Sequence, residues 1–150
     1  MCCLKQSPSR APDNIAAMTS APVVALSAGA SLELAVVLVV DDEAAIRAWL
    51  SRALIPHVKA VHTAASVGDG HRLAANLPHL DLLITDVVLP DARLRLADLV
   101  RVRHPHVRVL TISGYGCDQI GGPAVSFLPK PFSLEELLRC ARHVLDIPEP

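Results

Sequence analysis

The chain has 150 residues, of which 51% are hydrophobic and 19% are charged, a composition typical of one globular domain. Its 14 Lys and Arg nearly balance its 15 Asp and Glu, so the net charge is -1 and we expect neither a nucleic-acid surface nor a membrane surface. The longest uninterrupted apolar run, residues 34–40, is far below the roughly 20 residues of a membrane-spanning helix.

Residues 1–33 are rich in Ala, Ser and Pro and show no hydrophobic period, so we interpret them as a flexible leader before a single domain at 34–148. A mildly apolar piece at 21–30 is too weakly hydrophobic to favour a secretory signal. The cysteines lack the spacing of a zinc site or a disulfide framework, which favours reduced thiols in the cytoplasm. They are Cys2, Cys3, Cys117 and Cys140.

From Leu34 onward, short apolar runs alternate with helical patterns. The runs predict strands at 34–40, 58–63, 80–85, 107–112 and 125–128. The helical patterns cover 46–54, 67–77, 94–102 and 133–145. Residues 115–123 hold several Gly and a Pro, so we expect a turn of helix there at most. This alternation predicts an α/β fold: a doubly wound five-stranded parallel sheet, flavodoxin-like, with a shortened or missing fourth helix.

Three local features give sharper expectations. Ser133 and Glu136 form a capping box at the start of the last helix. Trp49 lies on the apolar face of the first helix, so we expect it in the core. His104 and His106 flank a proline, and we expect both to be exposed loop residues on a solvated basic face rather than a metal pair.

Polar residues follow the predicted strands at their carboxyl ends. In chain order they are Asp41, Asp42, Asp86, Ser113 and Lys130. Because the carboxyl ends of parallel strands share one edge, we expect these side chains to meet in one crevice. Carboxylates about 4 Å apart repel one another by a few kcal/mol at an effective dielectric near 20, so this group needs a cation. A site with oxygen ligands alone favours Mg²⁺ that keeps several of its waters.

Lys130 is flanked by prolines, and a residue before proline is held extended, which should aim its ammonium group. A cation, a lysine and a hydroxyl around one carboxylate form a site for a phosphoryl group, with Asp86 as the nucleophile. Each residue alone has a simpler interpretation: Asp42 as a helix N-cap, Ser113 as a turn residue and Phe127 as a core aromatic. Taken together, the residues favour the phosphoryl site.

Four motifs occur in a fixed order along the chain. They are VVDDE (39–43), LLITDVVLPD (82–91), TISGY (111–115) and SFLPKPF (126–132). Together they resemble the receiver domain of bacterial two-component response regulators. The resemblance implies that Asp86 accepts a phosphoryl group from a phosphohistidine on a histidine kinase or a phosphotransfer protein, and that the chain then signals by docking an unknown downstream protein.

The resemblance also implies a role for each site residue. Asp42 would bind Mg²⁺ directly and Asp41 mostly through water. Asp86 and the backbone carbonyl of Val88 would complete the protein ligands.

On the phosphoryl side of the site, the resemblance implies that Lys130 holds a phosphoryl oxygen and has a cis bond to Pro131. Ser113 and Phe127 would form the switch: Ser113 moves to hydrogen-bond the phosphate, and the rotamer of Phe127 follows.

Two departures from the family pattern affect the output surface. The loop after Pro90 lacks the usual glycine and is short, and so is the segment between Ser113 and Lys130. We therefore expect a remodelled surface beside the fourth strand. We expect a cytoplasmic regulator without an attached output domain, a monomer or weak dimer, and not an enzyme.

Three alternative functions fit these residues less well. A pseudo-receiver, a protein-interaction module working without phosphorylation, is expected to lose a site residue, and none is lost. A phosphatase of the haloacid dehalogenase type needs an acid where Val88 stands. A flavin-binding relative needs a hydroxyl-rich loop after the first strand, where Asp-Asp-Glu would repel phosphate.

Overall fold

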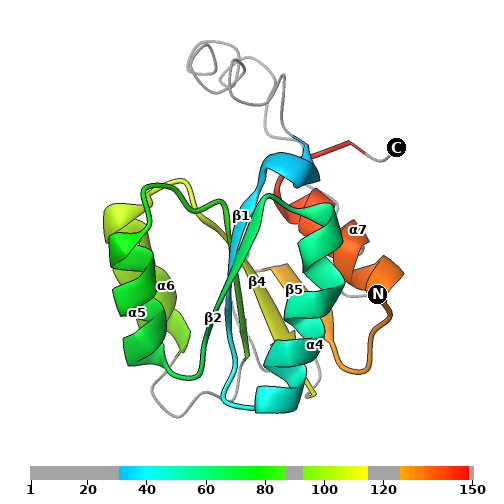
Figure 1. The fold of residues 1–150 in the computed structure, drawn as a ribbon, viewed down its shortest axis with the longest axis horizontal. Coiled ribbons are helices and arrows are strands. Elements are labelled where there is room, and N and C mark those ends of the chain that lie inside the picture. Colours follow the sequence, from blue (N-terminus) through cyan, green and yellow to red (C-terminus); the bar gives the residue numbers. More distant parts are fainter. Residues whose placement is uncertain (1–30, 87–92, 115–125, 149–150) are drawn as a thin grey trace, which may run out of the picture.

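The computed structural model describes residues 31–86, 93–114 and 126–148. Five parallel strands form one sheet in the order β2-β1-β3-β4-β5 (Figure 1). The strands are β1 Val36–Val40, β2 Ala60–Ala64, β3 Leu82–Asp86, β4 Arg108–Ser113 and β5 Ser126–Pro129. The predicted fold class is confirmed. The strand order reverses between β1 and β3, and open α/β sheets bind ligands beyond the carboxyl ends of the strands at such a point.

Four α-helices within the described residues cover the two faces of this sheet. They are α4 Ala44–Leu54, α5 Val67–Asn76, α6 Arg93–Arg103 and α7 Leu134–Val144, with short 3-10 helices η1 Leu32–Leu34 and η2 Ile55–His57. Helices α4 and α7 lie on one face, and α5 and α6 lie on the other (Figure 1). The expected shortening of the fourth helix falls at 115–123, which lies outside the described residues.

The central strands are buried on both faces, which explains their uninterrupted apolar sequences. In β1, Val37 and Val39 belong to the core cluster that contains the buried side chains of α4 and α7. Leu38 and Val40 belong to the cluster that contains those of α5 and α6. Because alternate residues of a strand point to opposite faces, β1 needs an apolar residue at every position. Such a close-packed sheet holds the residues at its carboxyl edge in fixed positions.

The first strand begins later than predicted. Leu34, expected in the strand, ends the 3-10 helix η1, and its side chain is 61% exposed. Leu32 is buried in the cluster beneath α7 instead. The apolar run therefore contains a change of conformation that hydrophobicity alone does not reveal.

The prediction that Trp49 lies in the core is wrong, because 43% of its surface is exposed. Helix α4 buries Leu50 and Leu54, and Trp49 lies at the border of that face. Its ring packs edge-on against Phe132, with the ring centroids 5.7 Å apart and the planes at 68°. The helical period predicts which face of the helix is directed at the core, but it does not decide whether a residue at the border of that face is buried or exposed.

The prediction that His104 is exposed is also wrong. His104 is only 7% exposed, and its Nε2 lies 2.7 Å from the carbonyl oxygen of Ala74. Because a carbonyl oxygen only accepts, Nε2 carries the proton in this bond. His104 therefore joins the end of α6 to the last turn of α5. His106 is exposed, as predicted.

The predicted capping box of α7 is confirmed. The Ser133 hydroxyl accepts from the Glu136 backbone N–H at 3.1 Å, and the Glu136 carboxylate accepts from the Ser133 N–H at 2.7 Å. These bonds favour the charged carboxylate, so they hold the pKa of Glu136 below its ordinary value. The apolar face of this helix includes Cys140, which is buried.

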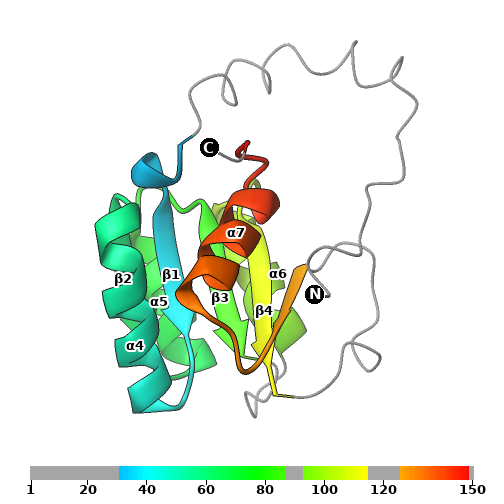
Figure 2. The same cartoon turned by 90° about the vertical axis from the view of Figure 1, so that its right-hand side faces the viewer.

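Both ends of the described domain lie at the amino edge of the sheet. Figure 2 shows η1, before β1, and the residues after α7 on the same side of the molecule. Leu32 and Ile147 pack in the same core cluster. Among the described residues, none of the helices has the length and apolar character needed to cross a membrane.

Candidate functional site

The acidic residues predicted to meet at the carboxyl edge do meet there. One carboxylate oxygen from each of Asp41, Asp42 and Asp86 lies within 4.8 Å of the others. Asp41 and Asp42 follow β1, and Asp86 is the last residue of β3. Since β1 and β3 are neighbours in register, their ends bring these residues together. Within the residues that the structure describes, this is the one such group of three potential metal ligands.

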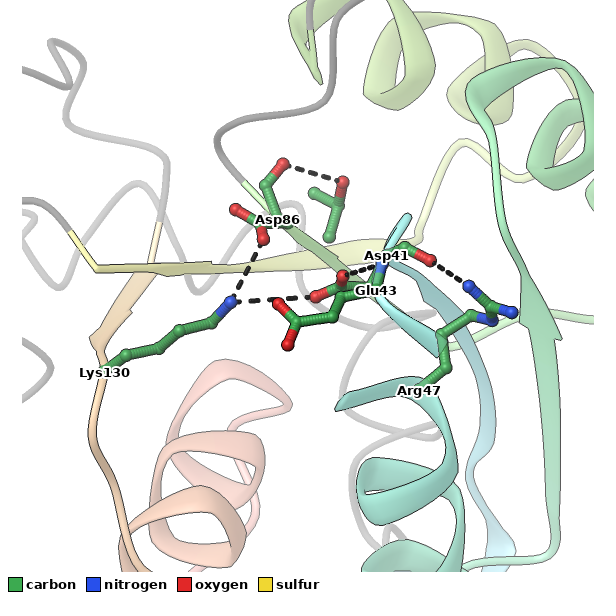
Figure 3. Close-up of polar contacts among 6 residues, drawn as sticks. Asp41, Glu43, Arg47, Asp86 and Lys130 are labelled. Atoms are coloured by element: carbon green, nitrogen blue, oxygen red, sulfur yellow. Dashed lines mark hydrogen bonds and ion pairs between the residues drawn. The ribbon is translucent and has the colours of Figure 1, made fainter. Parts of the chain in front are cut away.

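Lys130 directly follows β5, the end strand of the sheet, and its side chain extends along the same carboxyl edge to this cluster (Figure 3). Its Nζ lies 3.1 Å from Asp86 Oδ2 and 3.8 Å from Asp41 Oδ2. Its backbone N–H donates to the carbonyl oxygen of Ser113 at 2.7 Å, which ties the loop to the end of β4. The bond from Lys130 to Pro131 is cis, as predicted. One ammonium group thus bridges carboxylates that come from two different strands.

Asp41 is the buried member of the cluster, with 1% of its surface exposed. Its Oδ1 accepts from the Glu43 backbone N–H at 2.8 Å. Burial raises the pKa of Asp41, and the charges of Asp86 and Asp42 act in the same direction, against the Glu43 bond and Lys130. The folded protein therefore holds this carboxylate at a cost that a bound cation would lower.

Asp42 and Asp86 differ in exposure. Asp42 is exposed, whereas Asp86 is 7% exposed at the end of β3. The N-cap residue of α4 is Glu43, and its side chain makes no capping bond. The simpler interpretation of Asp42 as the N-cap is thus wrong: the chain places Asp42 before the cap, on the open side of the cluster.

Ser113 lies on β4, the neighbour of β3, and Phe127 lies on β5, the next strand after β4. Ser113 is the last residue of β4 and is fully buried, one residue beyond the partner of Asp86 in the sheet register. Phe127 is 6% exposed in β5 and pairs with Thr111 of β4. Ser113 therefore lies at the same edge as the acidic cluster. Phe127 is buried within β5, two residues before that strand ends. Val88 lies outside the described residues.

Sequence reasoning missed one residue at this edge. Arg47, near the start of α4, donates from Nη1 to the carbonyl oxygen of Asp41 at 2.7 Å (Figure 3). The signal in the sequence was weak: an arginine on the polar face of a predicted helix, about one turn after the Asp pair. Such an arginine usually faces solvent, and its contact to a backbone oxygen leaves no trace in residue spacing.

The donor set fits a hard divalent cation. Carboxylate oxygens are the ligands that Mg²⁺ prefers, and Mg²⁺ usually keeps several waters when it binds to a few carboxylates. Lys130 supplies a single positive charge against three carboxylates, so the cluster keeps an excess of negative charge. Asp42 gives the site an open side for water or a ligand oxygen.

Comparison with known proteins agrees with this arrangement. The family model of the response regulator receiver domain matches residues 37–142. The sensor kinase CckA of Brucella abortus (strain 2308) is 37% identical over 120 residues, which cover 75% of this chain and 13% of that protein. The DNA-binding transcriptional regulator NtrC of Azospirillum brasilense is 33% identical over 122 residues, covering 77% of this chain and 25% of that protein.

Among solved structures, the chemotaxis protein CheY4 of Vibrio cholerae superposes with a TM-score of 0.67 at 27% identity, covering 75% of this chain and 99% of that one. The chain thus spans a quarter or less of the two curated relatives named above and nearly all of a solved receiver-like chain. The chain belongs to the response regulator receiver domain family of two-component signal transduction.

Proposed function

We propose that the chain is a phosphoacceptor receiver domain in a two-component phosphorelay. Asp86 takes a phosphoryl group from a phosphohistidine of a histidine kinase or a phosphotransfer protein. One observation carries the proposal: Lys130, from β5, lies 3.1 Å from Asp86 inside a cluster of three carboxylates. A carboxylate beside a fixed ammonium group is arranged to attack phosphorus and to stabilise the charge that develops on the phosphoryl oxygens.

Each residue has a defined part in this transfer. A carboxylate oxygen of Asp86 forms the new P–O bond while the P–N bond to the donor imidazole breaks, and the imidazole keeps the electron pair. Lys130 then exchanges part of its contact with Asp86 for a phosphoryl oxygen. Ser113 donates its hydroxyl to another phosphoryl oxygen, and Phe127 changes rotamer as Ser113 moves. Partner docking follows from that switch.

The proposal includes Mg²⁺ as the cofactor, held by Asp41, Asp42 and Asp86 together with the backbone carbonyl of Val88. When bound, it neutralises negative charge between the carboxylates and the incoming phosphoryl group. The protein prepares this site by burying Asp41 and by fixing its Oδ1 on the Glu43 N–H at 2.8 Å. An open carboxylate, Asp42, leaves room for the ligand exchange that a phosphoryl group requires.

The partners follow from the same chemistry. We propose a histidine kinase or phosphotransfer protein upstream and a protein target downstream, in the cytoplasm, with a regulatory rather than an enzymatic role. The alternative of a pseudo-receiver is less well supported, because the residues it would lose are all present. They are Asp41, Asp42, Asp86 and Lys130.

The test is phosphorylation by a small acyl phosphate. Incubation with acetyl phosphate and Mg²⁺ should add one phosphoryl group to the intact protein, and base should release it, as expected for an acyl phosphate. Asp86→Ala should abolish the adduct, whereas the matched variant Asp98→Ala, at an exposed aspartate of α6, should keep it. An unmodified wild type, or an adduct that persists in Asp86→Ala, contradicts the proposal.

A further inference from the structure

Arg47 connects helix α4 to the backbone of the acidic cluster. Its Nη1 donates to the carbonyl oxygen of Asp41 at 2.7 Å. Figure 3 shows the guanidinium group on the side of Asp41 that faces away from Lys130 and Asp86. The arginine therefore contacts the backbone of a site residue without entering the site.

This contact is one of three that fix Asp41. The Asp41 backbone N–H donates to the carbonyl oxygen of Ala64, the last residue of β2, at 3.2 Å. Its Oδ1 accepts from the Glu43 N–H at 2.8 Å. With the Arg47 bond, the N–H, the C=O and the side chain of Asp41 are each held by a different neighbour. Because Asp41 is 1% exposed, little water is available to replace any of these partners.

The three contacts determine where the remaining oxygen of Asp41 points. Asp41 Oδ2 lies 3.8 Å from Lys130 Nζ, on the side of the cluster shared with Asp86. A rotation of the Asp41 peptide would move this oxygen, and the charged bond from Arg47 opposes such a rotation because bonds to an ionised donor are about twice as strong as neutral ones.

We propose that Arg47 is a positioning residue of the metal site: through its bond to the Asp41 carbonyl it holds the Asp41 carboxylate in the orientation that a divalent cation requires. The inference rests on the proposed function, because it concerns the cation of that same site. Groups that hold a metal ligand from behind commonly change metal affinity by 10- to 100-fold when they are removed.

Charge and position predict opposite results for the loss of Arg47. If the guanidinium acted only as a nearby positive charge, its removal would strengthen Mg²⁺ binding, since like charges repel. If it positions Asp41, its removal weakens Mg²⁺ binding. The sign of the change in affinity therefore separates the two accounts.

The experiment measures the Mg²⁺ dissociation constant by calorimetry on the full chain. Arg47→Met should raise this constant about tenfold. Arg47→Lys keeps the charge and a donor, so it should remain within about threefold of the wild type. The matched control is Arg52→Met, which removes an exposed arginine from the same helix and should leave the constant unchanged.

Phosphorylation kinetics give a second readout. In Arg47→Met the Mg²⁺ concentration for half-maximal phosphorylation by acetyl phosphate should rise by about the same factor. The rate at saturating Mg²⁺ should stay close to that of the wild type, because Asp86 and Lys130 are unchanged. If Arg47 had only a structural role, its loss would lower the melting temperature. It would not raise the half-maximal Mg²⁺ concentration while the rate at saturating Mg²⁺ stayed the same.

An Arg47→Met protein that is folded by circular dichroism and binds Mg²⁺ as tightly as the wild type, or more tightly, overturns the proposal. If that variant does not fold, Arg47→Gln, with a shorter uncharged side chain, takes its place with the same expectation. If the wild type binds no Mg²⁺, the proposed function is contradicted as well. If the wild type binds Mg²⁺ and the Arg47 variants bind it equally tightly, only the role of Arg47 is contradicted.

Discussion

The two ends of strand β3 carry aspartates with opposite surroundings. Asp81, just before the strand, accepts the Val36 N–H at 2.8 Å on one oxygen and lies 2.6 Å from His79 Nε2 on the other. Asp86, at the far end, lies among two further carboxylates and one ammonium group.

This contrast separates a structural carboxylate from the carboxylate of the proposed phosphoacceptor site. Asp81 is surrounded by donors, and its own N–H returns a bond to the Val36 carbonyl at 3.0 Å, so it fastens β1 to the start of β3. The cluster around Asp86 gathers three carboxylates near the single ammonium group of Lys130, and this excess of negative charge favours a cation. Residue type and position at a strand end are the same, and the neighbours decide the role.

The largest expected effect comes from removing the ammonium group of Lys130, which lies 3.1 Å from Asp86. Lys130→Met should lower the rate of phosphorylation by acetyl phosphate roughly 100-fold, because a fixed positive group no longer stabilises the transferring phosphoryl oxygens. Single-turnover intact-mass measurements at saturating Mg²⁺ give the rate. Lys59→Met, at an exposed lysine before β2, is the control and should react normally. A rate for Lys130→Met within a few-fold of the wild type would show that the ammonium group has no part in the transfer.

Removal of the structural carboxylate should affect stability instead of reactivity. Asp81→Ala should lower the free energy of unfolding by about 2 kcal/mol, because the Val36 N–H loses a charged acceptor. Urea unfolding measures this change. Asp98→Ala, whose carboxylate lies in solvent on α6, should change it by less than about 0.5 kcal/mol. The comparison of the two strand ends breaks down if Asp81→Ala is stable but no longer accepts a phosphoryl group.

Removal of a carboxylate from the acidic cluster should stabilise the protein. In the absence of Mg²⁺ at neutral pH, Asp41→Asn should raise the free energy of unfolding by about 1 kcal/mol, since it relieves burial of a charge among like charges. The same substitution should weaken the stabilisation that Mg²⁺ gives the wild type.

The gain in stability from Asp41→Asn should be larger at neutral pH than at low pH. Burial raises the pKa of Asp41 above its ordinary value of 3.8, so the folded protein binds this proton more tightly than the unfolded chain does. Wild-type stability therefore falls as the pH rises from 3.8 through the raised folded pKa of Asp41, and Asp41→Asn lacks this decrease. Melting temperatures that favour the variant equally at low and neutral pH would contradict this cause.

The smallest expected effect concerns Glu136, whose pKa is shifted in the opposite direction to that of Asp41. Backbone and hydroxyl donors of Ser133 lower the pKa of Glu136 below 4.5, so the unfolded chain binds this proton more tightly. The contribution of Glu136 is present above pH 4.5 and is lost as the pH falls through its lowered folded pKa. Glu136→Gln should reduce the acid-side slope of the melting temperature slightly, with Glu135→Gln, the adjacent exposed residue of α7, as the control. An unchanged slope in Glu136→Gln would mean that the capping bond does not favour the charged carboxylate.

Sequence alone predicts the fold and the main residues of the cluster for a simple physical reason. Parallel strands end at one edge, so an acid or a lysine after each apolar run is brought together without knowledge of any side-chain contact. That rule placed Asp41, Asp42, Asp86 and Lys130 together. Ser113 was predicted at the same edge, and the structure describes it there.

The remaining features depend on packing across the chain. His104 is buried because the carbonyl of Ala74, thirty residues earlier, accepts its Nε2–H. Trp49 is displaced to the surface because Leu50 and Leu54 already fill the space beneath α4. Arg47 reaches a backbone oxygen across a loop. Each of these contacts depends on the relative position of two elements, which the period of a single element does not contain.

The position of the domain's two flanks has a practical consequence. η1 enters and the residues after α7 leave on the amino side of the sheet, with Leu32 and Ile147 packed in one cluster there (Figure 2). A biosensor surface, an affinity handle or a fused fluorophore attached through either flank would thus lie at the end of the sheet opposite to the acidic cluster. In that orientation the attachment itself would not stand between the acidic cluster and a dissolved partner.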